Sequence, residues 1–502
     1  MTSAAAKAPP RRGLIPLALA ITLSFLCSPA WPQSVLQYHF SADRAGNYVV
    51  PGLTLERARS MHLDGDFDGR VDGHVYAQPL LFHEAGRELL VVATEDNVVD
   101  ALDARTGRLV WQRSLGPAVK SAMLPCGNIN PLGITGTPAI DASRRAIYLD
   151  AMVGTRHGPQ HLIFGLSLEE GQVPPGFPVN VAQALASRGL RFIPNDQNQR
   201  GALLIMHNTL YIPYGGHFGD CGNYHGWVVG MGLDDDHRFV TWSTSAAGGG
   251  IWAPGGVVSD GTSLFVTTGN TFETSQWGGG EAVIRLGFDL KPTESTRDYF
   301  TPSNWRMLDR RDADLGGTAS LPIDLSGSVG IARLMVALGK DGKAYLLNRD
   351  NLGGIGVGLA TMEVSSDEIR TAPAVYPAPD GGAFVAFPGT WNNCPGAASK
   401  GSIGALKVKA GRPPSMSVAW CAWLDGHGTP IVTTTDGRSN PIVWIVGAEG
   451  DDRLHAFRGD NGKSLLTEPQ VALQGLRHFA PIVATSEHMF VPADSRIYAF
   501  TP

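Results

Sequence analysis

The stretch from residue 75 to 115 alternates apolar runs with short polar segments: VYAQPLLF (75–82), EAGRE (84–88), LLVVATEDN (89–97), VVDALDA (98–104), RTGR (105–108) and LVWQRSL (109–115). The apolar runs are rich in valine, leucine and aromatic residues, which favour strands, and the polar segments carry residues typical of turns. Connections this short join neighbouring antiparallel strands. The stretch therefore predicts four antiparallel strands, the content of one blade of a β-propeller.

Related units recur along the chain, starting near residues 136, 202, 251, 337, 384, 443 and 480. Most of these starts lie roughly 50 to 65 residues apart, a spacing typical of blades with long loops on one rim. Amphipathic helices are nearly absent, whereas parallel α/β folds need helical crossovers between their strands. We therefore predict an all-β fold, a single β-propeller of four-stranded antiparallel blades, with eight blades favoured and seven as the alternative.

The last of these units is too short to supply four strands of its own. The early strand VLQYHF (35–40) is expected to complete it by pairing beside IYAF (497–500). Such pairing closes the ring and covers an exposed sheet edge.

The composition agrees with one repetitive β-architecture. The 502 residues include 62 glycines and 34 prolines, and 43% of them are hydrophobic, which is enough for a packed core. Charged residues make up only 17%, the net charge is −6, and no basic patch is visible. We therefore expect no nucleic-acid partner.

The first thirty residues have the pattern of a signal peptide. Lys7, Arg11 and Arg12 precede an apolar run (13–27), and Ser28-Pro29-Ala30 then places small residues at positions −3 and −1 of a cleavage site. This predicts a signal peptide at 1–30, a propeller domain at 31–502, and a periplasmic or secreted protein. An uncleaved anchor helix is the alternative, and the choice between general and twin-arginine export stays open. No later segment is long and apolar enough to span a membrane, so no transmembrane domain is expected in the mature chain.

Removal of this peptide leaves four cysteines, none in the paired spacing of a zinc site. Four cysteines in an oxidising compartment favour two disulfides over free thiols, with three connectivities open in principle. We expect Cys126 to pair with Cys221, because both lie in glycine-rich loops on one rim. Cys394 and Cys421 would then pair within one blade.

The segment ALDARTGRLVW (101–111) closely resembles the tryptophan-docking motif of quinoprotein alcohol dehydrogenases, a superfamily of β-propellers that bind pyrroloquinoline quinone (PQQ). LHAFRGDNGKSL (454–465) is a copy without the tryptophan, and GITGTP (133–138) is similar to a segment of exported quinoprotein-like propellers. The resemblance implies a PQQ-like propeller fold over the whole mature chain.

Five further positions resemble the cofactor site of that family. The resemblance implies that Trp252 in GGGIWAPGG forms the floor under the quinone and that Asn270 in VTTGN binds calcium. The stretch 300–317 resembles the family's segment with the catalytic aspartate, which implies that Asp314 is the catalytic base, with Asp312 as the second choice. The resemblance places Lys340, in LGKDGKAYLLNRD, against the quinone oxygens, where it serves both cofactor binding and catalysis. Asp220 would replace the family's acidic calcium ligand.

These residue types suit the oxidation of an alcohol. Calcium takes six to eight oxygen ligands, a cation polarises the quinone, and a carboxylate can accept the hydroxyl proton. The sequence thus predicts an exported PQQ- and calcium-dependent oxidoreductase acting on an alcohol or sugar. It would pass electrons to a separate acceptor, because no C-x-x-C-H heme motif is present.

One departure from the family supports a different function. The two adjacent cysteines that cover the cofactor in the family are missing from this sequence. The alternative is therefore a non-catalytic propeller that binds a protein or polysaccharide. If the first function holds, Trp252, Asn270, Asp314 and Lys340 must converge at one end of the central channel, with Asp220 near Asn270.

Overall fold

The computed structural model describes residues 1–6, 8, 33–84, 86–234, 236–272, 274–291, 295–326, 330–396, 399–466 and 470–502. The chain divides into a unit of residues 1–31 and a unit of residues 32–502. The predicted signal peptide, residues 1–30, falls almost entirely outside the described residues. None of the described helices is long and apolar enough to cross a membrane.

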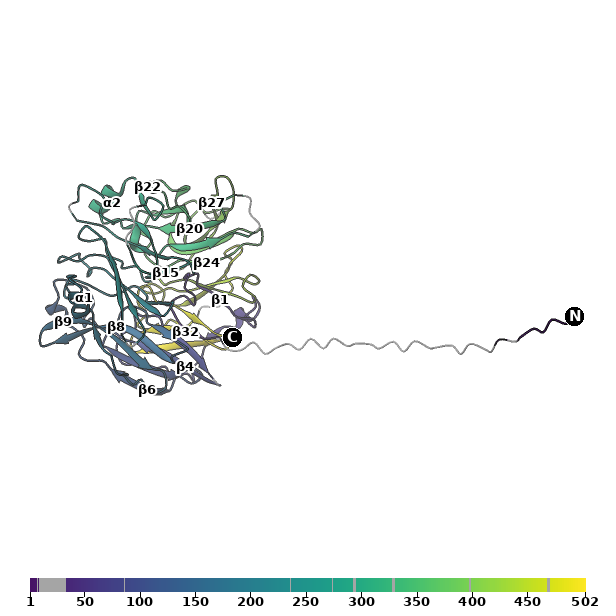
Figure 1. Ribbon diagram of the computed structural model, residues 1–502, viewed down its shortest axis with the longest axis horizontal. Coiled ribbons are helices and arrows are strands. Elements are labelled where there is room, and N and C mark those ends of the chain that lie inside the picture. Colours follow the sequence, from purple (N-terminus) through teal and green to yellow (C-terminus); the bar gives the residue numbers. More distant parts are fainter. Residues whose placement is uncertain are drawn as a thin grey trace. The chain divides into compact units, whose positions relative to one another are not determined.

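Eight sheets form the eight blades of a β-propeller in residues 32–502 (Figure 1). This confirms the all-β fold and the count of eight blades rather than seven. Blade 1 contains β3 (Leu80–Glu84), β4 (Arg87–Ala93), β5 (Val98–Asp103) and β6 (Leu109–Ser114). Blade 2 contains β7 (Ala139–Asp141), β8 (Ala146–Thr155), β9 (Gly158–Ser167) and β10 (Val179–Asn180). Blade 3 contains β11 (Leu204–Met206), β12 (Thr209–Tyr214), β13 (Trp227–Gly232) and β14 (Phe239–Ser243).

Blades 4 and 5 lie at the centre of the chain and carry the loops of the candidate site. A parallel strand, β22, extends the sheet of blade 4 to five strands. Blade 4 contains β15 (Val258–Ser259), β16 (Leu264–Thr267), β17 (Val283–Leu286), β18 (Tyr299–Pro302) and β22 (Gly354–Gly356). Blade 5 contains β19 (Leu321–Asp324), β20 (Arg333–Leu338), β21 (Lys343–Asn348) and β23 (Ala360–Glu363).

The last three blades include two strands from the N-terminal part of the unit. Blade 6 contains β24 (Ala374–Pro377), β25 (Ala383–Trp391), β26 (Gly401–Lys409) and β27 (Ser415–Ala422). Blade 7 contains β1 (Asn47–Val49), β28 (Ile431–Thr434), β29 (Ile442–Val446) and β30 (Leu454–Arg458). Blade 8 contains β31 (Val483–Ala484), β32 (Met489–Ala493), β33 (Arg496–Thr501) and β2 (His62–Leu63). The described helices are short: α1 (Val181–Ala186), α2 (Trp305–Arg311) and the 3₁₀ turns η1 (Arg57–Ser60), η2 (Ser121–Met123) and η3 (Leu315–Gly317).

Blades 5 to 7 begin earlier than the sequence pattern indicated. The starts expected near residues 337, 384 and 443 fall on the second strand of each blade, and the true first strands are β19, β24 and β28. Each of these first strands has only four residues. A run this short gives too little alternation to mark a strand.

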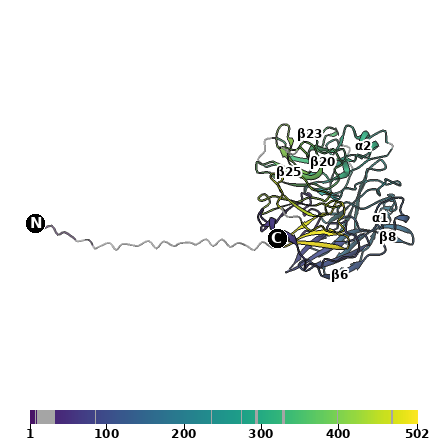
Figure 2. The ribbon, with the colours of Figure 1, turned by 180° about the vertical axis from the view of Figure 1, so that it is seen from behind.

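The prediction that residues 35–40 complete the last blade is wrong. Strand β2 does so instead, pairing antiparallel with β33 through His62 opposite Thr501 and Leu63 opposite Phe500. In both views the yellow C-terminal strands lie beside the purple strands of blade 1 (Figures 1 and 2). An N-terminal strand therefore does close the ring, as expected, but it lies about one strand further along the chain.

Residues 35–50 cross the inner strands of several blades around the propeller axis. The carbonyls of Leu36, Ala42 and Ala45 accept hydrogen bonds from β7, β15 and β24 at 2.8, 2.8 and 2.7 Å. Tyr38 is 2% exposed and packs with alanines that precede β11 and β24. Residues 35–40 therefore bridge the inner strands of several blades and do not form a blade strand, whereas Asn47–Val49 further on (β1) joins blade 7.

Tryptophan docking joins neighbouring blades as the motif predicted. The indole of Trp111, on β6, donates to the carbonyl of Leu168 in blade 2 at 2.9 Å. Its own motif begins with a turn in which Asp103 Oδ1 accepts from the amide and hydroxyl of Thr106. Trp420, on β27, docks in the same way on Gly459 of the copy at 454–465, at 2.8 Å.

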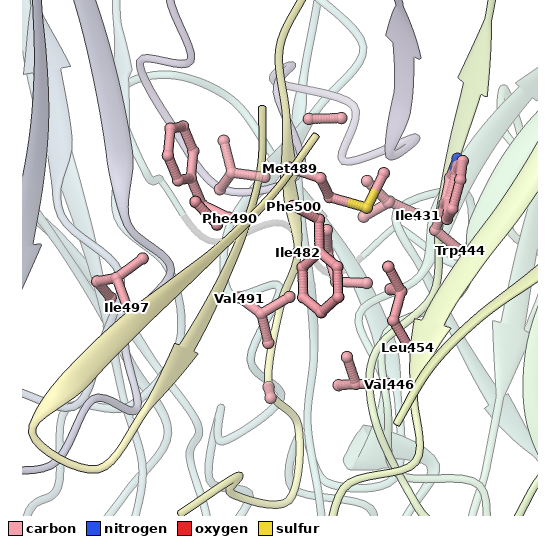
Figure 3. Packing of buried hydrophobic residues seen from close by; sticks show 14 of the residues in the cluster. Ile431, Trp444, Val446, Leu454, Ile482, Met489, Phe490, Val491, Ile497 and Phe500 are labelled. Atoms are coloured by element: carbon pink, nitrogen blue, oxygen red, sulfur yellow. The ribbon is translucent and has the colours of Figure 1, made fainter. Parts of the chain in front are cut away.

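Apolar side chains fill the spaces between blades, as Figure 3 shows for blades 7 and 8. Trp444 and Leu454 of blade 7 pack in one buried cluster with Met489 and Phe500 of blade 8. Trp444 is fully buried, and its indole donates to the hydroxyl of Thr433 at 2.8 Å. Each blade thus buries its faces on its neighbours, which allows so long a chain to form one ring.

Both predicted disulfides are present. Cys126 pairs with Cys221 and Cys394 pairs with Cys421, with Cα–Cα distances of 5.9 and 5.6 Å. The first joins the loop after η2 to the loop after β12, and the second joins the loop after β25 to the end of β27, within blade 6.

Candidate functional site

Four predicted residues lie on loops at one end of the propeller. Trp252 precedes the first strand of blade 4 and Asp314 precedes that of blade 5, while Asn270 and Lys340 follow the second strands of the same blades. Because successive strands of a blade run antiparallel, the loop before the first strand and the loop after the second strand share one end. The fold therefore brings the four positions to a single face.

The carboxylate of Asp314 is the centre of the cluster. Its Oδ1 accepts a hydrogen bond from the backbone amide of Asn270 at 2.8 Å. Its Oδ2 accepts from the indole of Trp252 at 3.2 Å and pairs with the ammonium of Lys340 at 2.7 Å. Asp314 is only 2% exposed. The structure thus brings all four predicted residues together, in contacts that link blades 4 and 5.

Gly269 shows how closely these groups approach. A Cβ atom added there would lie 2.9 Å from Asp314 Oδ1 and 3.1 Å from the indole nitrogen of Trp252. Any side chain at this position would push the carboxylate away from its donors. The glycine before Asn270 is therefore required by the cluster and not only by the local turn.

Burial and charge act in opposite directions on the central ion pair. Loss of hydration raises the pKa of Asp314, although the Lys340 ammonium beside it partly counteracts this. Burial also disfavours the charged form of Lys340, but the carboxylates of Asp314 and Asp312 outweigh it and raise its pKa. Lys340 contacts Oδ1 of Asp312 at 3.1 Å, while Asp312 itself is exposed. Asp314, not Asp312, is the buried carboxylate of the pair.

Asp220 lies beside Asn270, as expected. The Asn270 amide nitrogen and Asp220 Oδ2 are 3.4 Å apart, and the Tyr224 hydroxyl donates to Asp220 Oδ1 at 2.6 Å. Cys221 follows Asp220 directly, so the disulfide to Cys126 restrains the loop that carries this carboxylate.

Two further acids support the cluster and were missed in the sequence. Glu281 is fully buried, its Oε2 accepts from the Leu315 amide at 2.6 Å, and burial and the nearby Asp314 raise its pKa well above the usual range. Asp309, on α2, accepts from the amide and hydroxyl of Thr271 at 2.8 and 3.0 Å and so fixes the loop after Asn270. Glu281 belongs to no motif, and Asp309 lies in the stretch 300–317, where the resemblance pointed to Asp314 and Asp312 instead.

A third missed residue, Arg200, is a partly buried cation beside Trp252. Its guanidinium lies 5.5 Å from the centre of the Trp252 ring and 4.4 Å from that of Phe479. Burial lowers its pKa to about 10. Arg200 lies just before β11, the first strand of blade 3, as Trp252 lies just before β15, the first strand of blade 4. This shared position is the one feature of the sequence that could have pointed to Arg200.

The residues of the cluster fit a carboxylated quinone better than they fit a calcium ion. An indole face flanked by the cations of Lys340 and Arg200 is suited to a flat, anionic ring system. For calcium the chain offers the neighbouring oxygens of Asp220 and Asn270, whereas Asp314 is already engaged by three donors. Among the described residues, no three His, Cys, Asp or Glu side chains form a metal-binding group. Most of a calcium shell would have to come from the quinone and solvent.

No family model and no curated protein matches the chain. Solved structures do match it. A quinohemoprotein alcohol dehydrogenase from Pseudomonas putida HK5 aligns with a TM-score of 0.62 and 12% identity, over 93% of this chain and 80% of that one. A quinohemoprotein alcohol dehydrogenase from Comamonas testosteroni aligns with a TM-score of 0.62 and 13% identity, again over 93% of this chain and 80% of that one. A europium-containing methanol dehydrogenase aligns with a TM-score of 0.58 and 13% identity, over 91% of this chain and 89% of that one. At this identity the likeness shows that the chain shares the eight-bladed propeller fold of these dehydrogenases.

Proposed function

We propose that the protein is an exported quinoprotein-like oxidoreductase that binds PQQ with calcium at the Asp314 cluster and oxidises an alcohol or sugar. The observation that carries this proposal is the convergence of Trp252, Asn270, Asp314 and Lys340 on one buried carboxylate. These residues lie on separate loops, and nothing local in the sequence forces them together.

In this proposal Asp314 is the proton acceptor. Burial raises its pKa, which makes its carboxylate a stronger base than an exposed aspartate, and the adjacent Lys340 favours the ionised form. The indole of Trp252 and the amide of Asn270 hold the carboxylate in one orientation. The chain thus supplies an oriented base for the hydroxyl proton of the substrate.

The remaining residues would hold the cofactor. Trp252 would stack on the quinone, Lys340 and Arg200 would pair with its oxygens and carboxylates, and Asp220 and Asn270 would bind the cation. When bound, the quinone supplies the hydride acceptor. The two disulfides support a location outside the cytoplasm, where a separate electron acceptor would complete the turnover.

The test is dye-linked oxidation by protein reconstituted with PQQ and calcium, using a panel of simple alcohols and sugars. Asp314→Asn should abolish activity, because the amide cannot accept the proton. Asp312→Asn is the matched control, two residues away and exposed, and should keep most of the activity. Equal loss in both variants, or activity that survives Asp314→Asn, would refute the assignment of the base.

The second candidate function is a non-catalytic propeller that binds a protein or polysaccharide. The observation that favours it is that both oxygens of Asp314 already receive hydrogen bonds or charge from protein groups. A cluster satisfied in this way can serve the fold alone. Failure of the reconstituted protein to oxidise any member of the panel would favour this function.

A further inference from the structure

A cavity of about 240 Å³ opens between blades 6 and 7, on the same end of the propeller as the Asp314 cluster. Its walls come from the loops before β24, β28 and β31 and from the end of β25, and they include Asp367, Thr390, Trp423, Asp425, His427 and His478. The volume is near the lower limit of small-molecule sites, which hold roughly 300–1,000 Å³. The cavity is separate from the cluster, and none of the five predicted site residues lines it.

Trp423 is presented to this cavity by a rigid backbone. Its side chain is 63% exposed, although the next residue, Leu424, is buried. The Leu424 amide donates to Ser402 Oγ at 2.7 Å, and that hydroxyl donates back to the Leu424 carbonyl at 2.5 Å. The disulfide between Cys394 and Cys421 restrains the strand just before it. An exposed indole on a fixed backbone forms a ready-made platform for a flat apolar face.

The polar groups around the platform include both donors and acceptors. His427 and His478 stack with their ring centres 4.8 Å apart, and Glu449 binds Nδ1 of His478 at 3.0 Å, which orients its other nitrogen. Burial lowers the pKa of His478, and because Nδ1 of the neutral ring donates to Glu449, its Nε2 is left as an acceptor. Asp425 is exposed and lines the cavity, so its carboxylate is accessible to a ligand.

Charge in the cavity disfavours an anionic ligand. Glu368 and Arg370 pair at 3.4 Å, which leaves the carboxylates of Asp367 and Asp425 as the remaining formal charges. These carboxylates would repel an acid but are strong acceptors for hydroxyl groups. An aromatic platform surrounded by carboxylates, imidazoles and a hydroxyl matches a ligand with an apolar ring face and many hydroxyls.

We infer that this cavity is a binding site for a neutral saccharide, which stacks on Trp423 and donates hydroxyl hydrogen bonds to Asp425 and Asp367. The site lies close to the cluster, since His478 precedes Phe479, whose ring contacts Arg200 beside Trp252. A bound sugar chain would reach from the rim toward the centre of the propeller. The inference does not depend on catalysis or on the quinone.

The test is saturation-transfer NMR on the full mature protein without added cofactor, with maltose, cellobiose, lactose and sucrose as separate probes and choline as a cationic probe. At least one disaccharide should receive saturation from the protein. Trp423→Ala should abolish this signal, and Asp425→Asn should weaken affinity at least tenfold. Phe218→Ala is the matched control, because Phe218 is also an exposed aromatic residue close in sequence to a disulfide-bonded cysteine: its side chain is 71% exposed and Cys221 lies three residues further on. It should bind as the wild type does.

Three results would overturn the inference. One is that none of the four disaccharides binds. Another is that binding survives Trp423→Ala. The third is that choline binds through Trp423 and no disaccharide does, which would make the cavity an amine site. Because no quinone is present and no oxidation is measured, each of these outcomes is independent of the proposed oxidoreductase activity.

Discussion

The indole nitrogen of Trp252 lies 3.2 Å from Oδ2 of Asp314, although 62 positions separate the two residues in the chain. The contact joins the loop that enters blade 4 to the loop that enters blade 5. It places an aromatic face beside a buried carboxylate that already pairs with Lys340. The proposed chemistry of the protein depends on this arrangement, and so does part of its stability.

Removal of the ammonium from the central ion pair should be costly. Lys340→Met leaves Asp314 buried without its counter-ion, and we expect a loss of about 3–5 kcal/mol in the free energy of unfolding. Lys343→Met is the control, because Lys343 pairs with Asp341 at 3.5 Å in a more open setting and should cost no more than about 1 kcal/mol. Denaturant unfolding measures both. Equal losses would mean that the Asp314 pair has no special role.

Glu281 should make stability depend on pH. Its folded-state pKa lies well above the usual value, so the folded chain holds a proton that the unfolded chain releases above about pH 4.5. The stability contributed by Glu281 is complete below that pH and is lost as the pH rises toward the folded pKa. Glu281→Gln cannot ionise, so it should match the wild type near pH 5 and exceed it near pH 9.

Unfolding curves at these two pH values give the difference directly. Parallel pH profiles for the wild type and Glu281→Gln would contradict the assignment of a neutral acid. Glu281→Ala provides a second check, since it leaves the Leu315 amide without its acceptor and should cost about 1–3 kcal/mol near pH 5. Near pH 9 its cost relative to the wild type should be smaller, because alanine does not ionise and the wild type has lost the stability that neutral Glu281 contributes.

Tryptophan docking should contribute measurably at each junction where it occurs. Trp111→Phe and Trp420→Phe each remove one indole hydrogen bond to the next blade, and each should lose about 1 kcal/mol or somewhat more. Trp423→Phe should change stability very little, because that side chain is exposed. Thermal or denaturant unfolding of the three variants would decide the matter, and a large loss for Trp423→Phe alone would reverse this interpretation.

The two disulfides should differ in their contribution. The chain-entropy model gives about 4.7 kcal/mol for Cys126–Cys221 and about 3.6 kcal/mol for Cys394–Cys421, because their sequence separations are 95 and 27. We therefore expect the double serine variant of the first pair to unfold at lower denaturant than that of the second. If the variant of the second pair unfolds at lower denaturant instead, interactions in the folded state, and not loop length, determine how much each disulfide stabilises the protein.

The repeat of strands made the propeller predictable, because period-two apolar runs and glycine turns follow from local geometry. The convergence of Trp252, Asn270, Asp314 and Lys340 could be predicted only through the resemblance of their segments to a known family. The strand that closes the ring could not be identified, since residues 35–40 have the apolar pattern of a strand but form a turn, whereas β2 has only two residues. Which of them pairs with β33 depends on long-range packing around the axis.

Glu281, Asp309 and Arg200 show a second limit of the sequence. A glutamate or arginine in a glycine-rich loop ordinarily lies in solvent, and no local pattern marks these as buried. Each becomes part of the cluster because the ring closes several blades around one axis. Their roles follow from contacts between loops that are distant in the chain, and such contacts leave no trace in a single sequence.

The most direct test of the account is isothermal titration calorimetry of the mature protein with PQQ, in the presence of calcium and after its removal with a chelator. The account predicts one site per chain, weaker binding without calcium, and at least tenfold weaker binding for Trp252→Ala. Trp423→Ala, the same substitution at an exposed tryptophan, should bind PQQ as the wild type does. If PQQ does not bind, or binds equally well to Trp252→Ala, the Asp314 cluster is not a quinone site.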